Sequence, residues 1–316
     1  MPRLDPSALS DAARRLAGRP GAPTPPDAGA GAPVGPVALP APTGASPTAT
    51  VGGPSGAGVR PDLRALLAAG PLIGAFAGLR DPGVAGILAT AGFGVILVDR
   101  EHGVMSAREA QELVLAAHAA GIPAIVRIPE SLRSAVQDAL EAGADGILAP
   151  SVESADQAAA IASWCRYAPG GTRGLHPVTA ANDYGRVPMA EHLRRANGRV
   201  VVGVQIETAD GLRARERIVR TPGVDLVVHG PADLAASLGV TPGSEAARRA
   251  EAQVRDATDR AGRWYGDFAL HEGDAHAMLA AGVRLVLAAA DVGLLAGAGR
   301  ALVARIRAGA AEAPGP

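Results

Sequence analysis

From Leu63 onward, the chain alternates short runs of β-branched and aliphatic residues with longer segments rich in Ala, Leu and Arg. The short runs are typical of buried strands, and the longer segments carry apolar residues at helical spacing. This alternation predicts parallel strands joined by helices, because parallel neighbours need a long crossover connection. Eight candidate strands follow one another, at residues 72–76, 94–98, 124–128, 146–149, 200–206, 225–228, 267–270 and 284–288.

The segments between these strands predict the helices of the same repeated unit. The clearest helical patterns cover residues 106–120, 132–142, 155–166, 246–261 and 292–308, and Ser106 and Asp156 are capping residue types at or near the start of two of them. Eight parallel strands with their helices in about 250 residues predict a TIM (β/α)8 barrel, an α/β fold. A doubly wound open sheet is the rival, but residues 74–79 lack the third glycine of a dinucleotide-binding loop.

The first part of the chain differs sharply from the rest. Residues 21–58 are dominated by Pro, Ala, Gly, Ser and Thr, with almost no large apolar residue to bury, and such composition predicts disorder. We therefore expect a disordered arm at residues 1–59, a barrel domain at residues 60–309 and a disordered tail at residues 310–316. A functionless extension is favoured over a presequence or a docking tail, since disordered composition alone specifies no partner.

Composition narrows the classes of partner. The formal net charge is −1 with acids and bases interspersed, so there is no basic field to bind nucleic acid or an anionic membrane. The most apolar stretch, residues 283–295, is interrupted by Asp291 and is too short to cross a bilayer. The single cysteine, Cys165, cannot form an internal disulfide, and we expect it to be buried and unreactive. These features favour a cytoplasmic protein without nucleic-acid or membrane partners.

The absence of lysine limits the chemistry, because all 30 of the Lys and Arg positions are arginine. Carbon–carbon chemistry through a protein Schiff base, or through a lysine-anchored pyridoxal cofactor, therefore has no amine to use. Any such reaction must rely on a metal ion, a histidine or an arginine.

Polar residues stand where several of the candidate strands end. In a TIM barrel the active site lies at the C-terminal ends of the strands, so these side chains are expected to face one mouth. Glu207 and Asp233 each follow a β-branched run, and two carboxylates there can share one cation. The residues expected at the mouth are Asp99, Glu101, His102, Arg127, Gln205, Glu207 and Asp233.

Five motifs occur in an order that resembles one enzyme family. They are Asp99-x-Glu101-His102-Gly103, Val126-Arg127, Tyr167-Ala168-Pro169-x-Gly171-x-Arg173-Gly174, Gln205-Ile206-Glu207-Thr208 and Gly230-Pro231-x-Asp233-Leu234. Together they resemble the HpcH/HpaI aldolase family, metal-dependent class II aldolases that act on 4-hydroxy-2-oxo acids and 2-keto-3-deoxy sugar acids. The resemblance spans residues 63–306 and implies cleavage of such an acid to pyruvate and an aldehyde.

The resemblance also implies roles for individual residues. Glu207 and Asp233 are the expected ligands of a divalent cation, Mg²⁺, Mn²⁺ or Co²⁺, which suits hard oxygen ligands. Arg127 is expected to stabilise the developing enolate oxygen, and His102, oriented by Asp99, to act as the acid/base group. Binding of the 2-oxo acid substrate is expected to involve Gln205, Gly230, Pro231 and, unless it is purely structural, Arg173. The family also implies a homo-oligomer, a hexamer.

Several alternatives stay open. Glu207 and Asp233 could form a buried salt-bridge network with Arg127 that needs no metal. A citrate-lyase-like enzyme acting on a CoA thioester shares the barrel and the metal, and a catalytically silent barrel could act as a binding protein. His229 and Ala235 depart from the family pattern and could reshape the pocket wall. Four other histidines lie outside the motifs and are expected in loops or facing solvent; they are His176, His192, His271 and His276.

Overall fold

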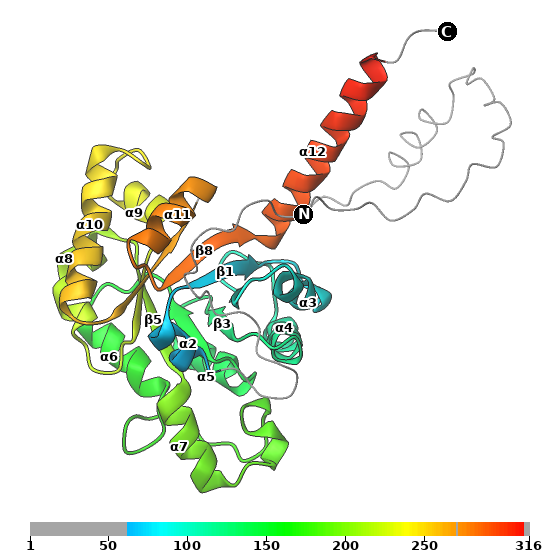
Figure 1. Ribbon diagram of the computed structural model, residues 1–316. Helices are drawn as coiled ribbons and strands as arrows, with labels where there is room; N and C mark the ends of the chain where they lie inside the picture. The colour runs from blue at the N-terminus through cyan, green and yellow to red at the C-terminus, as the bar shows by residue number, and fades with distance from the viewer. Residues whose placement is uncertain (1–61, 270, 313–316) are drawn as a thin grey trace, which may run out of the picture. The chain divides into compact units, whose positions relative to one another are not determined.

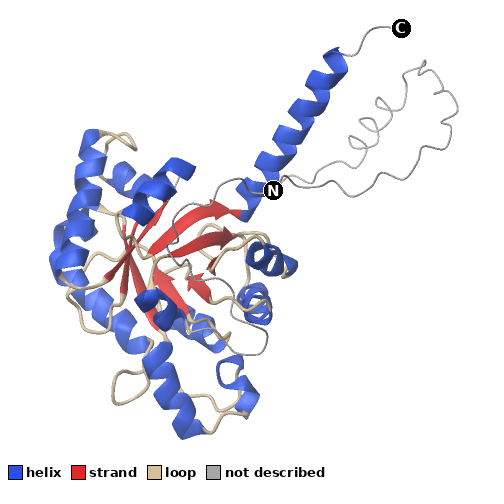
Figure 2. Ribbon diagram, viewed as in Figure 1, coloured by secondary structure: helices blue, strands red, loops and turns tan. Residues whose placement is uncertain are grey.

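The computed structural model describes residues 62–269 and 271–312, and of residues 309–312 only the backbone. Within these residues, eight parallel strands form a closed barrel in their sequence order (Figure 1), and helices surround it (Figure 2). The predicted (β/α)8 barrel is confirmed, and the open doubly wound sheet is excluded because β1 (Leu72–Ala77) pairs with β8 (Leu285–Ala290). The predicted arm at residues 1–59 lies outside the described residues.

The strands lie close to their predicted positions. They are β1 (Leu72–Ala77), β2 (Val95–Asp99), β3 (Ala124–Arg127), β4 (Gly146–Ala149), β5 (Val201–Ile206), β6 (Leu226–His229), β7 (Trp264–Phe268) and β8 (Leu285–Ala290). Strand β7 begins at Trp264 and not at residue 267, because Trp264 pairs with Leu226 of β6. The register places Asp99 opposite Arg127, so the ends of β2 and β3 meet at one edge of the barrel.

Helices connect successive strands on the outside of the barrel, and within the described residues one further helix precedes the first strand and another follows the last. The predicted cap at Ser106 is confirmed, because Ser106 and Glu109 form a reciprocal capping box. At α6 the cap is Ser154, and the predicted cap Asp156 lies instead in the first turn, where its charge favours the helix dipole. The helices are α2 (Leu63–Ala69), α3 (Gly83–Thr90), α4 (Ala107–Ala119), α5 (Arg133–Glu141), α6 (Ala155–Trp164), the 3₁₀ helix η1 (Ala180–Gly185), α7 (Met189–Arg199), α8 (Ala209–Val219), α9 (Pro231–Ser237), α10 (Glu245–Arg260), α11 (Glu272–Ala280) and α12 (Asp291–Glu312).

Alternation along the strands builds two apolar layers, one inside the barrel and one between the barrel and its helices. The strands are therefore buried on both faces, which explains their nearly continuous apolar runs. At the C-terminal ends of the strands the apolar residues give way to Asp99, Arg127 and Gln205, all of them buried.

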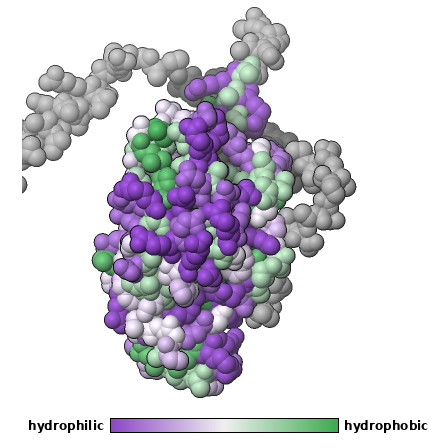
Figure 3. Space-filling model, turned by 90° about the vertical axis from the view of Figure 1, so that its left-hand side faces the viewer, coloured by the Kyte–Doolittle hydropathy of each residue, from purple (hydrophilic) through white to green (hydrophobic). Residues whose placement is uncertain are grey.

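The outer faces of α8 and α10 are rich in Arg and Glu, whereas their buried residues are small or aliphatic apart from Thr258. The side of these helices, which faces the viewer in Figure 3, is accordingly largely hydrophilic. No helix in residues 62–269 and 271–312 combines the length and the hydrophobicity that a membrane span requires.

Helix α12 leaves the barrel after β8 (Figure 1). At its start the buried carboxylate of Asp291 accepts hydrogen bonds from the backbone N–H groups of Gly78 and Leu79. Residues 310–312 of the predicted tail continue this helix, and residues 313–316 lie outside the described residues. Beyond Asp291 the helix exposes large apolar side chains, namely Val292, Leu294, Leu295, Leu302, Val303 and Ile306.

The histidines without a predicted role divide into two groups. His176, His271 and His276 are exposed, as expected. The prediction for His192 is wrong: it is the buried residue of α7, and its Nε2 lies 3.0 Å from the hydroxyl oxygen of Tyr167. On a helix face that packs inward, the buried position usually carries an aliphatic residue. In α7, whose other residues are mostly polar, His192 takes that position.

Cys165 is completely buried at the C-terminal end of α6, as predicted. Burial raises the pKa of its thiol to about 12, so the reactive thiolate is scarce at neutral pH. We predict that Ellman's reagent does not modify the folded protein over a period in which the guanidinium-unfolded protein reacts completely. Equal rates for the two states would contradict this burial.

Candidate active site

The ends of β2, β3 and β5 bring four predicted site residues to one mouth of the barrel. Asp99 ends β2, Arg127 ends β3, and Gln205 and Glu207 lie on either side of the last residue of β5. All four side chains are buried. A cavity of about 590 Å³ opens at this mouth; it is lined by Phe76, Gly78, Leu79, Arg80, Asp99, His102, Gly103, Val104, Arg127, Ala290, Asp291 and Val292.

Two carboxylates hold Arg127. Its Nε and Nη2 donate to the two carboxylate oxygens of Asp99, at 2.9 and 2.7 Å, in a bidentate pair. Its Nη1 lies 3.1 Å from Oε2 of Glu101. In the described part of the chain Arg127 forms no ion pair with Glu207 or Asp233. The metal-free network of Arg127 with those two carboxylates is therefore not the arrangement found.

Asp99 also shapes the loop that follows β2. Its Oδ1 accepts hydrogen bonds from the backbone N–H groups of Glu101 and His102, at 3.1 and 3.3 Å. Gly103 is required in this loop, because a Cβ there would lie 2.3 Å from the carbonyl oxygen of Asp99. Burial alone would raise the pKa of Asp99, but Arg127 and the two N–H groups together lower it below its ordinary value. Asp99 is therefore an anion that fixes both the loop and the guanidinium.

His102 lies at the edge of the cavity with its side chain 60% exposed. Its Nε2 lies 3.8 Å from Oε2 of Glu101. Asp99 contacts His102 through the backbone N–H, so the expected orientation of the ring by Asp99 is replaced by a contact with Glu101. An exposed imidazole beside a carboxylate can exchange a proton with a molecule in the cavity.

The carboxylate of Glu207 is fixed from both sides. Its Oε1 accepts hydrogen bonds from the backbone N–H and the hydroxyl of Ser151, at 2.8 and 3.0 Å. Its Oε2 accepts a hydrogen bond from Nε2 of Gln205. Gly230 packs directly against this oxygen, since a Cβ at that position would lie 2.5 Å from Oε2. The glycine is therefore needed for the close approach of the β6 end to the carboxylate.

Asp233 lies in the first turn of α9, which has Pro231 at its first position. It is exposed, and its charge acts on Glu207. Burial raises the pKa of Glu207 above its ordinary value, and Asp233 adds to this effect while the Ser151 hydrogen bonds oppose it. Burial likewise raises the pKa of Glu101, with a contribution from the charge of Glu207. Such crowding of negative charge marks a place that favours a cation.

The donor set at the mouth fits a hard divalent cation. Glu207 and Asp233 offer carboxylate oxygens, the ligands that Mg²⁺ and Mn²⁺ prefer. The Oε1 atom of Gln205 is buried beside them without a hydrogen-bond partner, which points to a missing group. No set of three His, Cys, Asp or Glu side chains among the described residues forms a metal-binding group. A cation held here would therefore need further oxygens from water or from a bound molecule.

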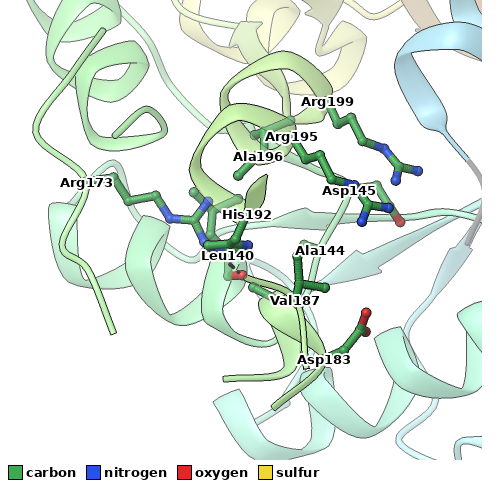
Figure 4. A pocket seen from close by; sticks show the side chains of 12 residues that line it. Leu140, Ala144, Asp145, Arg173, Asp183, Val187, His192, Arg195, Ala196 and Arg199 are labelled. Carbon is green, nitrogen blue, oxygen red and sulfur yellow. Dashed lines mark hydrogen bonds between the residues drawn. The ribbon is translucent and has the colours of Figure 1, made fainter. Parts of the chain in front are cut away.

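Arg173 is not brought to this mouth. Its Nη2 donates to the carbonyl oxygen of Leu140 at 3.2 Å, and its guanidinium lies 4.5 Å from the ring centroid of Tyr167. It lines a cavity of about 90 Å³ together with Asp145 and Val200, which directly precede β4 and β5 (Figure 4). This is the N-terminal end of the barrel, opposite the mouth. The expected contact of Arg173 with substrate is not supported, and its contacts are structural.

Two family departures remain, of which His229 ends β6 and so lies at the same end of the barrel as the mouth. His229 and Ala235 line another cavity, of about 560 Å³, beside α9, α10 and α11. There the Nδ1 of His229 lies 3.4 Å from Oδ1 of Asp267. Neither residue is among those that line the cavity of about 590 Å³, and Pro231, which was expected to contact the substrate, lines this second cavity with them.

Two residues that contact the site residues had no role assigned from the sequence. Glu101 pairs with Arg127, and its place inside the Asp99-x-Glu101-His102 motif was the available signal. Ser151 binds Glu207, but it follows Pro150 in a segment that carries no recognised motif.

Replacing Asp99 by Asn should destabilise the fold, because the buried Arg127 loses its charged bidentate partner. At neutral pH we expect the free energy of unfolding to fall by about 3 kcal/mol. Since the pKa of Asp99 is lowered, its contribution is present above the ordinary value of 3.8 and is lost as the pH falls through the lowered pKa. Urea unfolding at neutral and acidic pH measures this. An equal difference between wild type and variant at both pH values would contradict the assignment.

Comparisons with known proteins agree on one family. The profile of the HpcH/HpaI aldolase/citrate lyase family matches residues 72–298. The chain is 37% identical to a hydroxypyruvate/pyruvate aldolase of Paraburkholderia phytofirmans over 230 residues, 70% of this chain and 88% of the relative. It is 39% identical to a 4-hydroxy-2-oxovalerate aldolase of Rhodococcus jostii over 238 residues, 74% of this chain and 90% of the relative.

A solved structure extends the likeness to three dimensions. The crystal structure of the HpcH/HpaI aldolase from Desulfitobacterium hafniense DCB-2 matches with a TM-score of 0.74 and 30% identity, over 80% of this chain and 98% of that one. The chain therefore belongs to the HpcH/HpaI aldolase/citrate lyase family.

Proposed function

We propose that this protein is a divalent-cation-dependent aldolase that cleaves a 4-hydroxy-2-oxo acid or a 2-keto-3-deoxy sugar acid to pyruvate and an aldehyde. The distribution of charge at the mouth carries this proposal. Arg127 is paired with Asp99 and Glu101. Glu207 and Asp233 repel each other, with no cationic side chain paired to either among residues 62–269 and 271–312. The relatives named hydroxypyruvate/pyruvate aldolase and 4-hydroxy-2-oxovalerate aldolase support the proposed reaction.

Glu207 and Asp233 are the residues proposed to hold the cation, Mg²⁺, Mn²⁺ or Co²⁺. When bound, such a cation supplies Lewis-acid stabilisation of the charge that develops on the 2-oxo acid. Glu207 is already oriented by Ser151 and Gln205, so it can bind without rearrangement. The chain has no lysine, so a Schiff base cannot take over this role.

Arg127 is proposed to stabilise the negative charge on the ketone oxygen as the carbon–carbon bond breaks. Asp99 accepts hydrogen bonds from two of the five N–H donors of a guanidinium, and Nη1 also faces Oε2 of Glu101 at 3.1 Å. One N–H each on Nη1 and Nη2 is then left at the wall of the cavity. The bidentate pair restrains rotation of the guanidinium. The remaining donors are therefore preorganised for the oxyanion.

His102 is proposed as the acid/base group. During cleavage its imidazole takes the proton from the 4-hydroxyl group, and in the reverse direction it returns that proton. The Oε2 of Glu101, 3.8 Å from Nε2, stabilises the imidazolium that forms. Gln205, Gly230 and Pro231 are proposed to contact the 2-oxo acid, with the unpaired Oε1 of Gln205 accepting a hydrogen bond from bound water or a hydroxyl group.

We also propose a homo-oligomer in which α12 packs against a second copy of the chain. The exposed apolar residues of α12, Leu294, Leu295 and Leu302 among them, are unfavourable in water and would be stabilised by burial. The family resemblance implies a hexamer.

Pyruvate release from a panel of 4-hydroxy-2-oxo acids, followed with lactate dehydrogenase, tests the proposed function. The wild type should release pyruvate with added Mg²⁺, Mn²⁺ or Co²⁺, and a chelator should abolish this release. Glu207→Ala and Asp233→Ala should each lower kcat/KM at least about 100-fold, because each removes a ligand of the cation.

Glu130→Ala is the matched control, since Glu130 is an exposed carboxylate in the loop after β3 and should leave turnover unchanged. Wild-type turnover in either ligand variant would refute the ligand assignment. Cation binding without pyruvate release would refute the aldolase proposal and leave two alternatives. Cleavage of a CoA thioester would then favour the citrate-lyase-like enzyme, and the absence of turnover on every substrate would favour the silent barrel.

The oligomer has its own test. Analytical ultracentrifugation of the wild type should give a mass that is a multiple of the chain mass. The double variant Leu295→Glu/Leu302→Glu should lower the measured mass toward that of a single chain. Arg300→Ala, on the same helix, should leave the mass unchanged. A wild type that sediments as a single chain would contradict the proposal.

A further inference from the structure

Ser151 is the residue through which the end of β4 reaches Glu207. Ser151 is the second residue after β4, preceded by Pro150, and β4 pairs with β5. Its backbone φ is 51°, in the left-handed region that is uncommon for serine. Such a conformation persists where the surrounding contacts impose it, and these positions cluster at functional sites.

Hydrogen bonds on both sides impose this conformation. Before Ser151, the hydroxyl of Ser131 donates to the carbonyl oxygen of Pro150 at 2.9 Å. After it, the backbone N–H of Val152 donates to the carbonyl oxygen of Gln205 at 3.1 Å. The segment is thus tied to the loop after β3 and to β5 around Ser151, and the strained residue itself faces Glu207.

The contacts of Ser151 distinguish the two oxygens of Glu207. A carboxylate oxygen accepts about two hydrogen bonds. The N–H and the hydroxyl of Ser151 supply both for Oε1, at 2.8 and 3.0 Å. Oε2 receives one hydrogen bond, from Gln205, and keeps capacity for another partner. Oε2 is therefore the oxygen that Glu207 presents to a ligand.

We propose that Ser151 is a positioning residue of the metal centre, which locks Glu207 so that Oε2 is presented to the cation and thereby sets the affinity for the cation. This role rests on the proposed function, because it takes Glu207 as a ligand. A neutral hydroxyl suits the role: it orients the carboxylate through a strong hydrogen bond but leaves the negative charge for the cation. An arginine at this position would compete with the cation for that charge.

Binding of Mn²⁺ to the full-length protein, with free Mn²⁺ measured by electron paramagnetic resonance, tests this role. Ser151→Ala removes the hydroxyl and keeps the N–H, and it should weaken Mn²⁺ binding about tenfold. Ser151→Gly should weaken binding similarly although glycine accepts the left-handed conformation without strain, because it also lacks the hydroxyl. Ser151→Thr, which restores a hydroxyl, should recover most of the affinity.

Ser131→Ala is the matched control, because Ser131 contacts the same segment but not Glu207. It should bind Mn²⁺ as the wild type does. At saturating Mn²⁺, Ser151→Ala should recover the wild-type kcat, since Arg127 and His102 are unchanged. A displaced catalytic group would not be restored by added metal, so kcat would then stay low.

Wild-type affinity in both Ser151→Ala and Ser151→Gly would overturn the role of Ser151. An equal loss of affinity in Ser131→Ala would also overturn it, because the effect would then belong to the position of the whole segment. A wild type that binds no Mn²⁺ would refute the metal centre itself, so failure of the proposed function is distinguished from failure of the role of Ser151.

Discussion

The bidentate pair between Arg127 and Asp99 is the interaction on which the rest of the mouth depends. Arg127 is only 6% exposed, and a buried charge without a partner would be strongly destabilising. Asp99 is that partner and accepts two hydrogen bonds from Arg127, and Glu101 also lies beside the guanidinium. Because Arg127 is held in this way, it forms no ion pair with Glu207 within the described residues, although its charge opposes the rise in the pKa of that carboxyl. The negative charge that remains on the other side of the mouth is the physical reason to propose a divalent cation there.

The closed barrel places the Arg127–Asp99 pair and Glu207 on different strand ends of one mouth. The register of β2 and β3 places Asp99 opposite Arg127, whereas Glu207 follows β5. Glycines at 103 and 230 allow the backbone to approach Asp99 and Glu207 more closely than any side chain would permit. One carboxylate is thus oriented by a guanidinium and stays paired, while the other is oriented by neutral donors and stays available. The same set of strand ends therefore provides both an anchored cationic donor and a cation-binding carboxylate.

Much of this arrangement could be predicted because its signals are local. Apolar runs locate the strands, and a polar residue after a run locates the mouth, so the convergence of Asp99, Arg127 and Glu207 follows from the barrel topology. Contacts that depend on tertiary packing or on rare backbone conformations could not be predicted. Arg173 packs on Tyr167 at the opposite end of the barrel, and its loop sequence does not say which end it reaches. Ser151 adopts a conformation that serine seldom adopts, so no propensity identifies it.

Diffraction from crystals grown with Mn²⁺ and oxalate, which resembles the enolate of pyruvate, tests whether Glu207 and Asp233 hold a cation while Arg127 stays paired to Asp99. Data collected where manganese scatters anomalously locate the cation without reference to activity. We expect one anomalous peak per chain, in contact with carboxylate oxygens of Glu207 and Asp233, with Arg127 still paired to Asp99. An anomalous peak elsewhere, or an empty mouth in which Arg127 has turned to pair with Glu207, would contradict it.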